Sequence, residues 1–382
     1  MPAPPSVECG MRQAHSRLPV PKHMAQEKIG RWIRQEIRSL AAYRVPEADG
    51  LVKLDAMENP YPWPEPMREP WLQALRRVDL NRYPDPEARV LKARLREYLQ
   101  LPQGGGLLLG NGSDELIQLI MMTVAGPHKK VLYPAPSFAM YGLISRTIGL
   151  EPFGVPLQAD DFGLDLDAML AAIEEHQPAV VFIAYPNNPT GNLYARRDVK
   201  QVIRASPGLV VIDEAYFAFS QDTFMQDLGH NEDLLVLRTL SKVGLAGLRV
   251  GMLAGSVSWL EQINKVRLPY NLNNLSQVSA DFMLAHAEVL EEQVHQIRAE
   301  RDRLYKELQA LDGIKVWPSE TNFLLLRVTD ADRLFSALKA NNILVKDLNG
   351  SHPLLSDCLR VTVGTPNENQ MLLDALHRLI SR

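Results

Sequence analysis

Short apolar runs alternate with amphipathic segments between about residues 105 and 255. The apolar runs have the length and composition of buried strands, and they read LLLG, KKVLYPAP, AVVFIAYP, GLVVIDEAY and LLVLRTLSK. Segments between them, such as DELIQLIMMTVAG, have the spacing of amphipathic helices. This alternation predicts an α/β domain with a mostly parallel central sheet and helices on both faces. Functional side chains are expected at the carboxyl ends of its strands.

The pattern changes after about residue 275. A long helical stretch over 282–311 is followed by strand-like runs within 315–328 and 358–364. This order predicts a smaller α+β domain that a long helix joins to the first. The predicted divisions are a disordered N-terminal extension (1–27), an arm that joins the small domain (28–55), a large domain (56–272) and a small C-terminal domain (273–382).

The composition is that of an ordinary globular protein, with 46% apolar and 23% charged residues. A net charge of -4 gives no reason to expect nucleic acid or an anionic membrane as a partner. No apolar run approaches the roughly 20 residues that span a bilayer, and no secretory signal precedes Met24, which is itself a candidate start. Only Cys9 and Cys358 are present, so we expect no disulfide framework, no metal site and a cytoplasmic location.

The strongest local signal is RTLSKVGLAGLR, residues 238–249, directly after the apolar run LLVL. A lysine at the end of a buried strand, here Lys242, is placed where desolvation lowers its pKa and makes the amine a nucleophile. Thr239, Ser241 and Arg249 supply the hydroxyls and the cation that a phosphate group requires. A lysine in this position is more often an ordinary surface residue, so the interpretation depends on its neighbours.

Two further strand ends carry matching chemistry. Asp213 ends the strand GLVVID, with Tyr216 three residues later, and a buried carboxylate is costly unless it pairs with a cation such as a protonated ring nitrogen. Asp-Glu after a strand also occurs in nucleotide-hydrolysing enzymes, but the Gly-rich loop that they need is missing. The turn AYPNNPTG follows the strand AVVFI and presents Asn188, whose amide can donate to a ligand oxygen or simply stabilise the turn.

A phosphate cradle is predicted in LLLGNGSDELIQLI. The strand breaks at Gly110, and Gly112, Ser113 and Asp114 open a helix whose first N–H groups face outward. A plain helix cap has the same sequence, so the signal is moderate. Phe138 and Tyr141 follow the next strand, where either ring could stack on a planar heterocycle or belong to the core.

Together, Asn188-Pro189, Asp213 with Tyr216, and Ser241-Lys242 leading to Arg249 resemble the fold-type I, aspartate-aminotransferase-like enzymes that use pyridoxal 5′-phosphate (PLP). Within them the chain is most similar to the histidinol-phosphate aminotransferases, from about residue 28 to the end. The motifs that carry this likeness are SLAAYRVP, KLDAMENPYP, NRYPDPEA, GNGSDELI, RTLSK, SETNFLLLRV and CLRVTVGTPNEN.

The resemblance implies a cofactor role for each matching residue. Lys242 would hold PLP as a Schiff base and act as general acid/base, Asp213 would pair with the pyridine nitrogen, and Asn188 and Tyr216 would bond the phenolic oxygen. Phe138 would stack on the ring. The residues implied at the cofactor phosphate are Gly112, Ser113, Asp114 through its backbone, Thr239, Ser241 and Arg249.

The resemblance also implies partners and substrates. Tyr83 would reach the cofactor phosphate of a neighbouring subunit, so the active unit would be a homodimer. Arg360 would bind the substrate carboxylate, and Tyr43, Asn59, Lys346 and Asn188 are the other implied substrate contacts. The implied reaction transfers the amino group of L-histidinol phosphate to 2-oxoglutarate, giving imidazole acetol phosphate and L-glutamate in histidine biosynthesis.

Two positions depart from the family pattern. Arg249 lies seven positions after Lys242, where a spacing of eight is common, and Lys346 stands where an arginine is expected near the substrate phosphate. A threonine-phosphate decarboxylase or an aromatic aminotransferase would share nearly all of these motifs. A binding protein on the same fold is a remoter alternative, because it would not need Lys242, Asp213 and Asn188 together.

Overall fold

The structure is a computed structural model that describes residues 22–42 and 45–380. The chain divides into two compact units, residues 1–44 and 45–382. The described part of the first unit holds two helices, α1 (Lys22–Trp32) and α2 (Gln35–Arg38). Ile29 and Trp32 on α1, and Ile33 just after it, are exposed. The second unit contains both β-sheets and all the other helices of the described chain.

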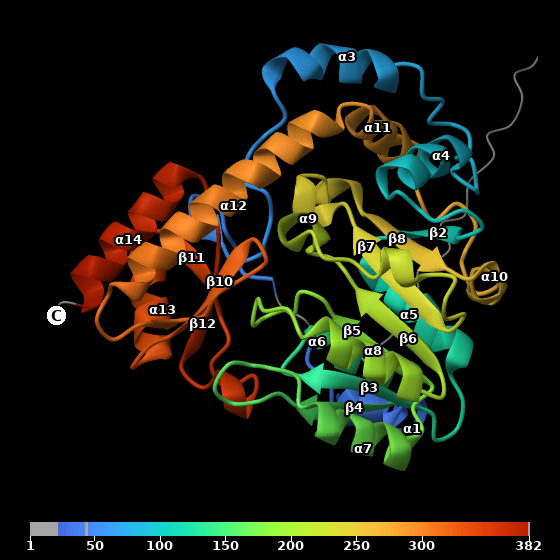
Figure 1. The fold of residues 1–382 in the computed structure, drawn as a ribbon, viewed down its shortest axis with the longest axis horizontal. Helices are drawn as coiled ribbons and strands as arrows, with labels where there is room; N and C mark the ends of the chain where they lie inside the picture. Colours follow the sequence, from blue (N-terminus) through green and yellow to red (C-terminus); the bar gives the residue numbers. More distant parts are fainter. Residues whose placement is uncertain (1–21, 43–44, 381–382) are drawn as a thin grey trace, which may run out of the picture. The chain divides into compact units, whose positions relative to one another are not determined.

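A seven-stranded sheet forms the centre of the larger part of the second unit, in the order β2-β8-β7-β6-β5-β3-β4 (Figure 1). Strand β8 is antiparallel to β2 and to β7, and all other neighbouring pairs in this sheet are parallel. The bounds are β2 (Gly106–Asn111), β3 (Lys130–Ala135), β4 (Glu151–Pro156), β5 (Val180–Ala184), β6 (Leu209–Asp213), β7 (Leu234–Thr239) and β8 (Val250–Gly255). The predicted mostly parallel sheet is therefore confirmed.

Both faces of the central strands are buried, which explains why β5 is apolar throughout and β6 is apolar up to Asp213. Along β5, Val180 and Phe182 face one core, while Val181 and Ile183 face the other. Helices α5 (Ser113–Val124) and α10 (Val257–Asn264) cover the first face. The opposite face is covered by α4 (Arg89–Tyr98), α7 (Leu166–His176), α8 (Arg196–Ala205) and α11 (Asn274–Leu284). The remaining elements of this part are α3 (Glu65–Leu75), α6 (Ala139–Ile148), α9 (Phe217–Ser220) and the 3₁₀ turns η1 (Met225–Asp227), η2 (Ser241–Val243) and η3 (Ala246–Leu248).

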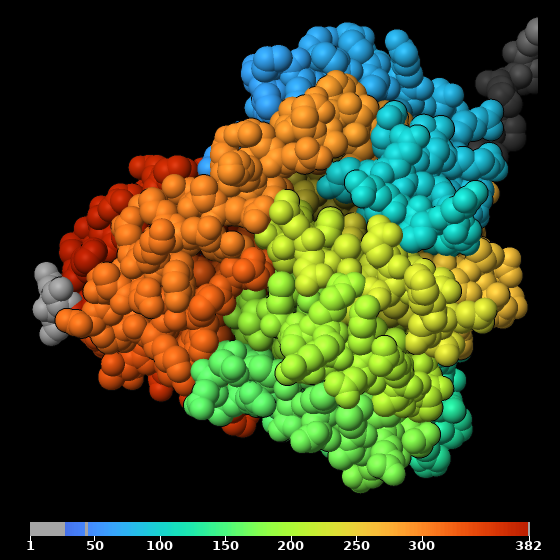
Figure 2. All heavy atoms as spheres, viewed as in Figure 1, coloured from blue at the N-terminus to red at the C-terminus, as the bar shows by residue number. Residues whose placement is uncertain are grey.

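A second sheet of five strands has the order β1-β11-β12-β10-β9. Its strands are β1 (Val52–Leu54), β9 (Lys315–Val316), β10 (Phe323–Arg327), β11 (Ile343–Asp347) and β12 (Cys358–Thr362). With it pack α12 (Ala287–Gln309), α13 (Ala331–Ala340) and α14 (Pro366–Ile380), and the 3₁₀ turn η4 (Pro353–Leu355) precedes β12. In Figure 2, α12 (orange) lies between the red C-terminal segments and the yellow-green part of the chain. The smaller α+β part thus includes a strand from before the large sheet.

The segment predicted as one long helix over 282–311 is two helices in the structure, so that detail was wrong. Helix α11 ends at Leu284, and His286 leaves the helical conformation before α12 begins at Ala287. An imidazole nitrogen of His286 bonds the Phe282 carbonyl oxygen at 2.9 Å, which favours the break. The predicted strand within 315–328 is likewise divided into β9 and β10 around Pro318. No helix among the described residues is long and apolar enough to cross a membrane.

Candidate active site

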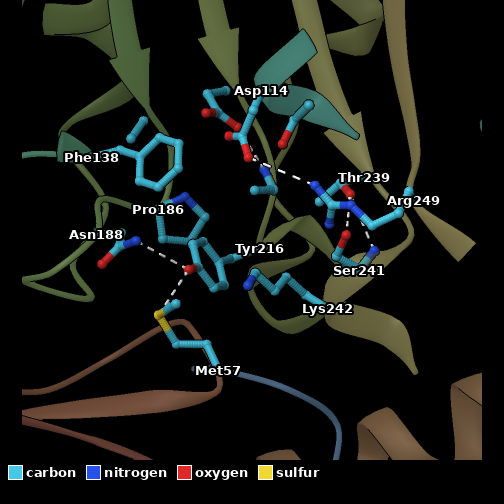
Figure 3. Close-up of a pocket in the computed structure, with 14 residues that line it drawn as sticks. Met57, Asp114, Phe138, Pro186, Asn188, Tyr216, Thr239, Ser241, Lys242 and Arg249 are labelled. Atoms are coloured by element: carbon cyan, nitrogen blue, oxygen red, sulfur yellow. Dashed lines mark hydrogen bonds and ion pairs between the residues drawn. The ribbon is translucent and has the colours of Figure 1, made fainter. Parts of the chain in front are cut away.

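The carboxyl ends of the parallel strands meet at one edge of the large sheet, and a cavity of about 570 Å³, including its mouth, lies there. This volume is in the usual range for small-molecule sites. Antiparallel β8 begins at the same edge, so the residue before it, Arg249, also reaches the cavity. The lining residues are Met57, Ser113, Asp114, Phe138, Ala184, Pro186, Asn188, Asp213, Ala215, Tyr216, Thr239, Ser241, Lys242 and Arg249 (Figure 3).

Lys242 lies in the turn η2, just after β7, and its side chain extends into the cavity beside Tyr216 (Figure 3). Its Nζ donates to the Ala56 carbonyl oxygen at 3.4 Å, a long hydrogen bond. Burial, and then the positive charge of Arg360, lower the pKa of Lys242 from 10.5 to about 8. The amine is thus desolvated, and a substantial fraction of it is neutral near physiological pH.

Asp213 is the last residue of β6, and only 5% of it is exposed. Its Oδ2 accepts a 2.7 Å hydrogen bond from the Tyr141 hydroxyl, and its Oδ1 accepts one of 3.1 Å from the Ala215 N–H. Burial raises the pKa of Asp213 to about 6 in spite of these donors. No described residue forms an ion pair with it, so this buried carboxylate lines the cavity without a cation beside it.

Replacing Asp213 with asparagine is expected to stabilise the protein without cofactor. The folded-state pKa of about 6 lies above the unfolded value near 3.8, so ionisation costs about 3 kcal/mol of folding free energy. This cost is absent below pH 4, grows as the pH rises to 6 and is complete above it. Urea unfolding of Asp213→Asn and wild type from pH 4 to 8 measures the difference. A difference that does not grow with pH contradicts the expected cost.

Asn188 and Tyr216, which the sequence singled out together, lie side by side in the cavity wall. The Asn188 Nδ2 donates to the Tyr216 hydroxyl oxygen at 3.2 Å, and that hydroxyl donates to the Met57 sulfur at 3.3 Å. Burial raises the pKa of Tyr216 well above its usual value, so the phenol remains a donor. Two groups able to donate therefore face one region of the cavity wall.

A cradle for an anion lies at the other side of the cavity. Helix α5 begins at Ser113 with Gly112 as its N-cap, and no side chain caps its first N–H groups. Gly112 has a positive φ of 84°, and a Cβ there would lie 2.5 Å from an Arg249 nitrogen, so only glycine allows this approach. The Thr239 hydroxyl donates to the Ser241 hydroxyl oxygen at 2.8 Å, beside the same arginine (Figure 3).

Arg249 reaches the cradle although its loop has one residue fewer than is common. The short turns η2 and η3, with Gly244 at a φ of 108° between them, carry the chain across. The Arg249 Nη2 lies 3.7 Å from the Asp114 carboxylate. Burial raises the pKa of Asp114, and the charges of Arg249 and Lys242 oppose that rise. The cradle thus combines a helix N-terminus, three hydroxyls and a guanidinium with one carboxylate.

The five-stranded sheet places one cation, Arg360, against the cavity-lining residue Asn188, although neither Arg360 nor Lys346 is itself a lining residue. Arg360, on β12, donates to the Asn188 Oδ1 at 2.6 Å and to the Asp55 carbonyl oxygen at 2.8 Å, and it is 7% exposed. Lys346 lies directly opposite Arg360 on β11, so both side chains project from the same face of the sheet. Thr362, two residues beyond Arg360, accepts a hydrogen bond from the Met57 N–H at 2.9 Å.

Residues 49–376 match the family of aminotransferases of class I and II. Histidinol-phosphate aminotransferase 2 of Nitrosococcus oceani is 54% identical over 92% of this chain and 98% of its own, and the enzyme of Chromobacterium violaceum is 52% identical over 91% and 97%. The chain belongs to the histidinol-phosphate aminotransferases. A crystal structure of such an enzyme from Sinorhizobium meliloti, in complex with pyridoxal-5′-phosphate, has the same fold, with a TM-score of 0.81 at 24% identity over 92% of this chain and 98% of its own. The predicted fold class is therefore confirmed.

Not every residue that the aminotransferase resemblance singled out lines the cavity. Asn59 donates to the Gln293 Oε1 at 2.8 Å and accepts from the Tyr61 N–H, and it is not a lining residue. Tyr83 is 80% exposed and stacks on Tyr270. Tyr43 lies outside the described residues.

Sequence reasoning missed Met57, Ala184, Pro186 and Ala215 as lining residues of the aminotransferase site, and it missed Tyr141 as the partner of Asp213. Ala184, Pro186 and Ala215 each adjoin a strand end that was already singled out, so position alone would have found them. Met57 lies far along the chain from every other lining residue, and its motif KLDAMENPYP was the only available signal. Tyr141 was considered only as a stacking or core ring.

Proposed function

We propose that this protein transfers the amino group of L-histidinol phosphate to 2-oxoglutarate with PLP as cofactor, giving imidazole acetol phosphate and L-glutamate. The observation that carries the proposal is the pairing of groups in one cavity. A lysine amine with a pKa lowered to about 8 and a buried carboxylate without a cation line the same space. A protonated pyridine nitrogen is the cation that this carboxylate lacks, and an aldehyde is the partner of this amine.

The other lining residues fit the remaining groups of PLP. The N-terminus of α5, Ser113, Asp114 through its backbone, Thr239, Ser241 and Arg249 would hold the phosphate. Gly112 keeps the approach to this cradle open. Asn188 and Tyr216 would bond the phenolic oxygen, and Phe138 would cover the ring from the start of α6.

When it is bound, PLP takes up the electron pair left by a bond broken at the substrate's α carbon. The chain's own part is to move the proton. The Lys242 Nζ, largely desolvated, takes the proton from that carbon and later returns one, as a general base and then a general acid. Asp213 contributes by keeping a negative charge at the ring nitrogen.

Residues of the five-stranded sheet would bind the anionic groups of the substrates. Arg360 offers a planar fork that suits a carboxylate or a phosphate oxygen pair, and Lys346 adds a point charge on the same face. Two cations of different geometry let one site take both L-histidinol phosphate and glutamate, which carry different anions. Asn188, which already bonds Arg360, orients that fork.

The decisive experiment separates the two halves of the reaction. The protein with PLP is mixed with L-histidinol phosphate alone, and the keto product is measured by mass spectrometry; 2-oxoglutarate is then added and glutamate is measured. Stoichiometric keto product followed by glutamate supports the proposal. Carbon dioxide release from phosphothreonine identifies a decarboxylase instead, and keto product from aromatic amino acids alone identifies an aromatic aminotransferase. Absence of PLP binding rejects the cofactor.

We also propose that two copies of the chain form the active unit. Large apolar side chains are exposed on two adjoining loops and the first turn of α11, and we name Leu80, Tyr83, Leu268, Tyr270 and Leu275 the tyrosine patch. The loops are held together by the stacked rings of Tyr83 and Tyr270 and by hydrogen bonds from Asn274 to the carbonyl oxygens of Asp79 and Arg82. Such a patch favours a protein interface. Because Tyr83 does not line its own cavity, it is free to extend to that of a second copy.

Mixing two inactive variants tests this arrangement. Tyr83→Ala and Lys242→Ala damage different halves of a shared site, so a mixed dimer keeps one intact site. Random exchange of subunits makes half of the dimers mixed, and about a quarter of wild-type activity is expected to return. Light scattering measures the dimer, and the coupled assay measures the recovery. Mixed dimers that recover nothing contradict a role for Tyr83 across the interface.

We further propose a cytoplasmic location and the division of the chain into an extension, an arm and two domains. The free, buried thiol of Cys358 supports a cytoplasmic location. The domain boundaries at residues 27, 55 and 272 are also proposed, with the placement of β1 in the five-stranded sheet as support for an arm that joins the small domain.

A further inference from the structure

Tyr141 lies in the first turn of α6 and is fully buried. Its ring stacks on Phe182 of β5, with the centroids 4.8 Å apart, and meets Phe138 edge-on at 5.6 Å. These contacts fix the ring in one orientation. A phenol in such a place costs free energy unless its hydroxyl finds a partner, and phenylalanine would fill the same apolar space.

The partner of this hydroxyl is Asp213. The 2.7 Å bond to Oδ2 is the only side-chain hydrogen bond that Asp213 accepts among the described residues, and the Ala215 N–H serves the other oxygen. The two donors restrain both oxygens, so the carboxylate cannot rotate without losing a bond. Because Asp213 also lines the cavity, its remaining lone pairs are presented to whatever occupies that space.

The charges around Asp213 do not favour its ionised form. Burial raises its pKa, and so do the negative charges of Asp114 in α5 and of Glu214, the residue after β6. The guanidinium of Arg238, on β7, lies 2.8 Å from Glu214 and is committed to that carboxylate. The positive charges of Lys242 and Arg249 lower the pKa of Asp114. The charge of Arg360 lowers the pKa values of Lys242 and Tyr216. Two neighbouring phenols, Tyr194 and Tyr216, raise the pKa of Tyr141. The Tyr141 hydroxyl is therefore the main side-chain group that supports a negative charge on Asp213.

We propose that Tyr141 is a positioning residue, whose hydroxyl orients the Asp213 carboxylate and supports its charge so that it meets the cofactor's ring nitrogen as an anion. The proposal rests on the proposed function for the identity of that ring. Its structural half, the support of the Asp213 charge by a buried phenol, concerns only residues of this chain.

The chain offers a matched control in Tyr133. This residue of β3 packs against the same core, with its ring 5.8 Å from that of Tyr141, and burial raises the pKa of its hydroxyl as well. It makes no hydrogen bond to Asp213. Tyr133→Phe therefore removes a neighbouring phenol oxygen and leaves the proposed contact in place, whereas Tyr141→Phe removes the contact and leaves the ring.

The first test measures the dissociation constant of PLP from pH 5 to 9 for wild type and both variants. A hydrogen bond to a charged group is worth a factor of roughly ten or more, so Tyr141→Phe should weaken PLP binding about tenfold at pH 7. The pH at which binding falls to half on the acid side should rise by about one unit. Tyr133→Phe should match wild type in both respects. If Tyr141→Phe behaves like Tyr133→Phe, the proposal is rejected.

A second test needs no cofactor and so separates this proposal from the proposed function. The pH dependence of unfolding is compared for Tyr141→Phe in the wild-type and the Asp213→Asn background. Loss of the hydrogen bond raises the cost of an ionised Asp213, so the destabilisation by Tyr141→Phe should grow as the pH rises through about 6. In the Asp213→Asn background it should not change with pH. Equal pH dependence in the two backgrounds means that Tyr141 only packs the core.

Discussion

Lys242→Ala is expected to lose transamination by roughly 10⁴-fold or more, since positioned acid–base catalysis alone contributes about 10²–10⁴-fold and the covalent link to the cofactor is lost as well. Among the described residues that line the cavity, Lys242 is the only amine. Single turnovers with L-histidinol phosphate, followed by mass spectrometry of the keto product, measure the loss. Lys242→Arg is the matched variant that keeps a positive charge without a usable amine, and it should be nearly as slow. A Lys242→Ala variant with more than about one hundredth of wild-type activity contradicts the assignment.

Replacing Lys242 should not unfold the protein, so unfolding would not explain the lost activity. The folded-state pKa of Lys242, about 8, lies below the unfolded value of 10.5. The charged amine therefore destabilises the fold, fully below pH 8 and progressively less as the pH rises to 10.5. Lys242→Met, which fills the space without a charge, should raise the unfolding midpoint at pH 7 and lose this advantage by pH 10.5. Thermal melts of the cofactor-free protein measure this.

Substitution of Arg360 should also have a large effect, and the size of this effect should depend on the amino donor. Removing one member of a buried charged pair costs about 2–5 kcal/mol, so Arg360→Met should lower kcat/KM for glutamate by roughly 10²–10³-fold. Arg360→Lys keeps the charge that lowers the pKa of Lys242 but lacks the bidentate fork. It should recover only part of the loss. Steady-state kinetics with each amino donor measures both variants.

Lys346 provides the matched comparison, because it lies opposite Arg360 on the same face of the sheet. Lys346→Met should lower kcat/KM for L-histidinol phosphate about tenfold, and Lys346→Arg should keep or improve it, since arginine offers a phosphate two hydrogen bonds. Glutamate should respond less to this position than to Arg360. If Lys346→Met affects both donors equally while Arg360→Lys behaves as wild type, the two anion roles have been assigned to the wrong cations.

The local chemistry of the site could be predicted from the sequence because strand ends are marked in it. Asp213 ends the strand β6, Lys242 comes three residues after β7 and Asn188 four residues after β5, and parallel strands bring such positions to one edge. Helix α5 begins at Ser113, as the motif GNGSDELI indicated, although β2 continues to Asn111 rather than ending at Gly110. The alternation of apolar runs and amphipathic segments also predicted a mostly parallel sheet, but not its strands β4 and β8.

Contacts between distant segments could not be predicted in this way. Met57 reaches Tyr216, 159 positions away, and Arg360 reaches Asn188, 172 positions away, only because the folded chain brings these distant segments together. The break at His286 within an otherwise helical pattern and the hydrogen bond from Tyr141 to Asp213 also depend on the packed chain. Periodicity and strand-end position are local properties, so the sequence by itself determined the elements and the chemical groups that they carry. Which groups touch, and with what charge, is set by burial and by long-range packing, and only the tertiary structure decided it.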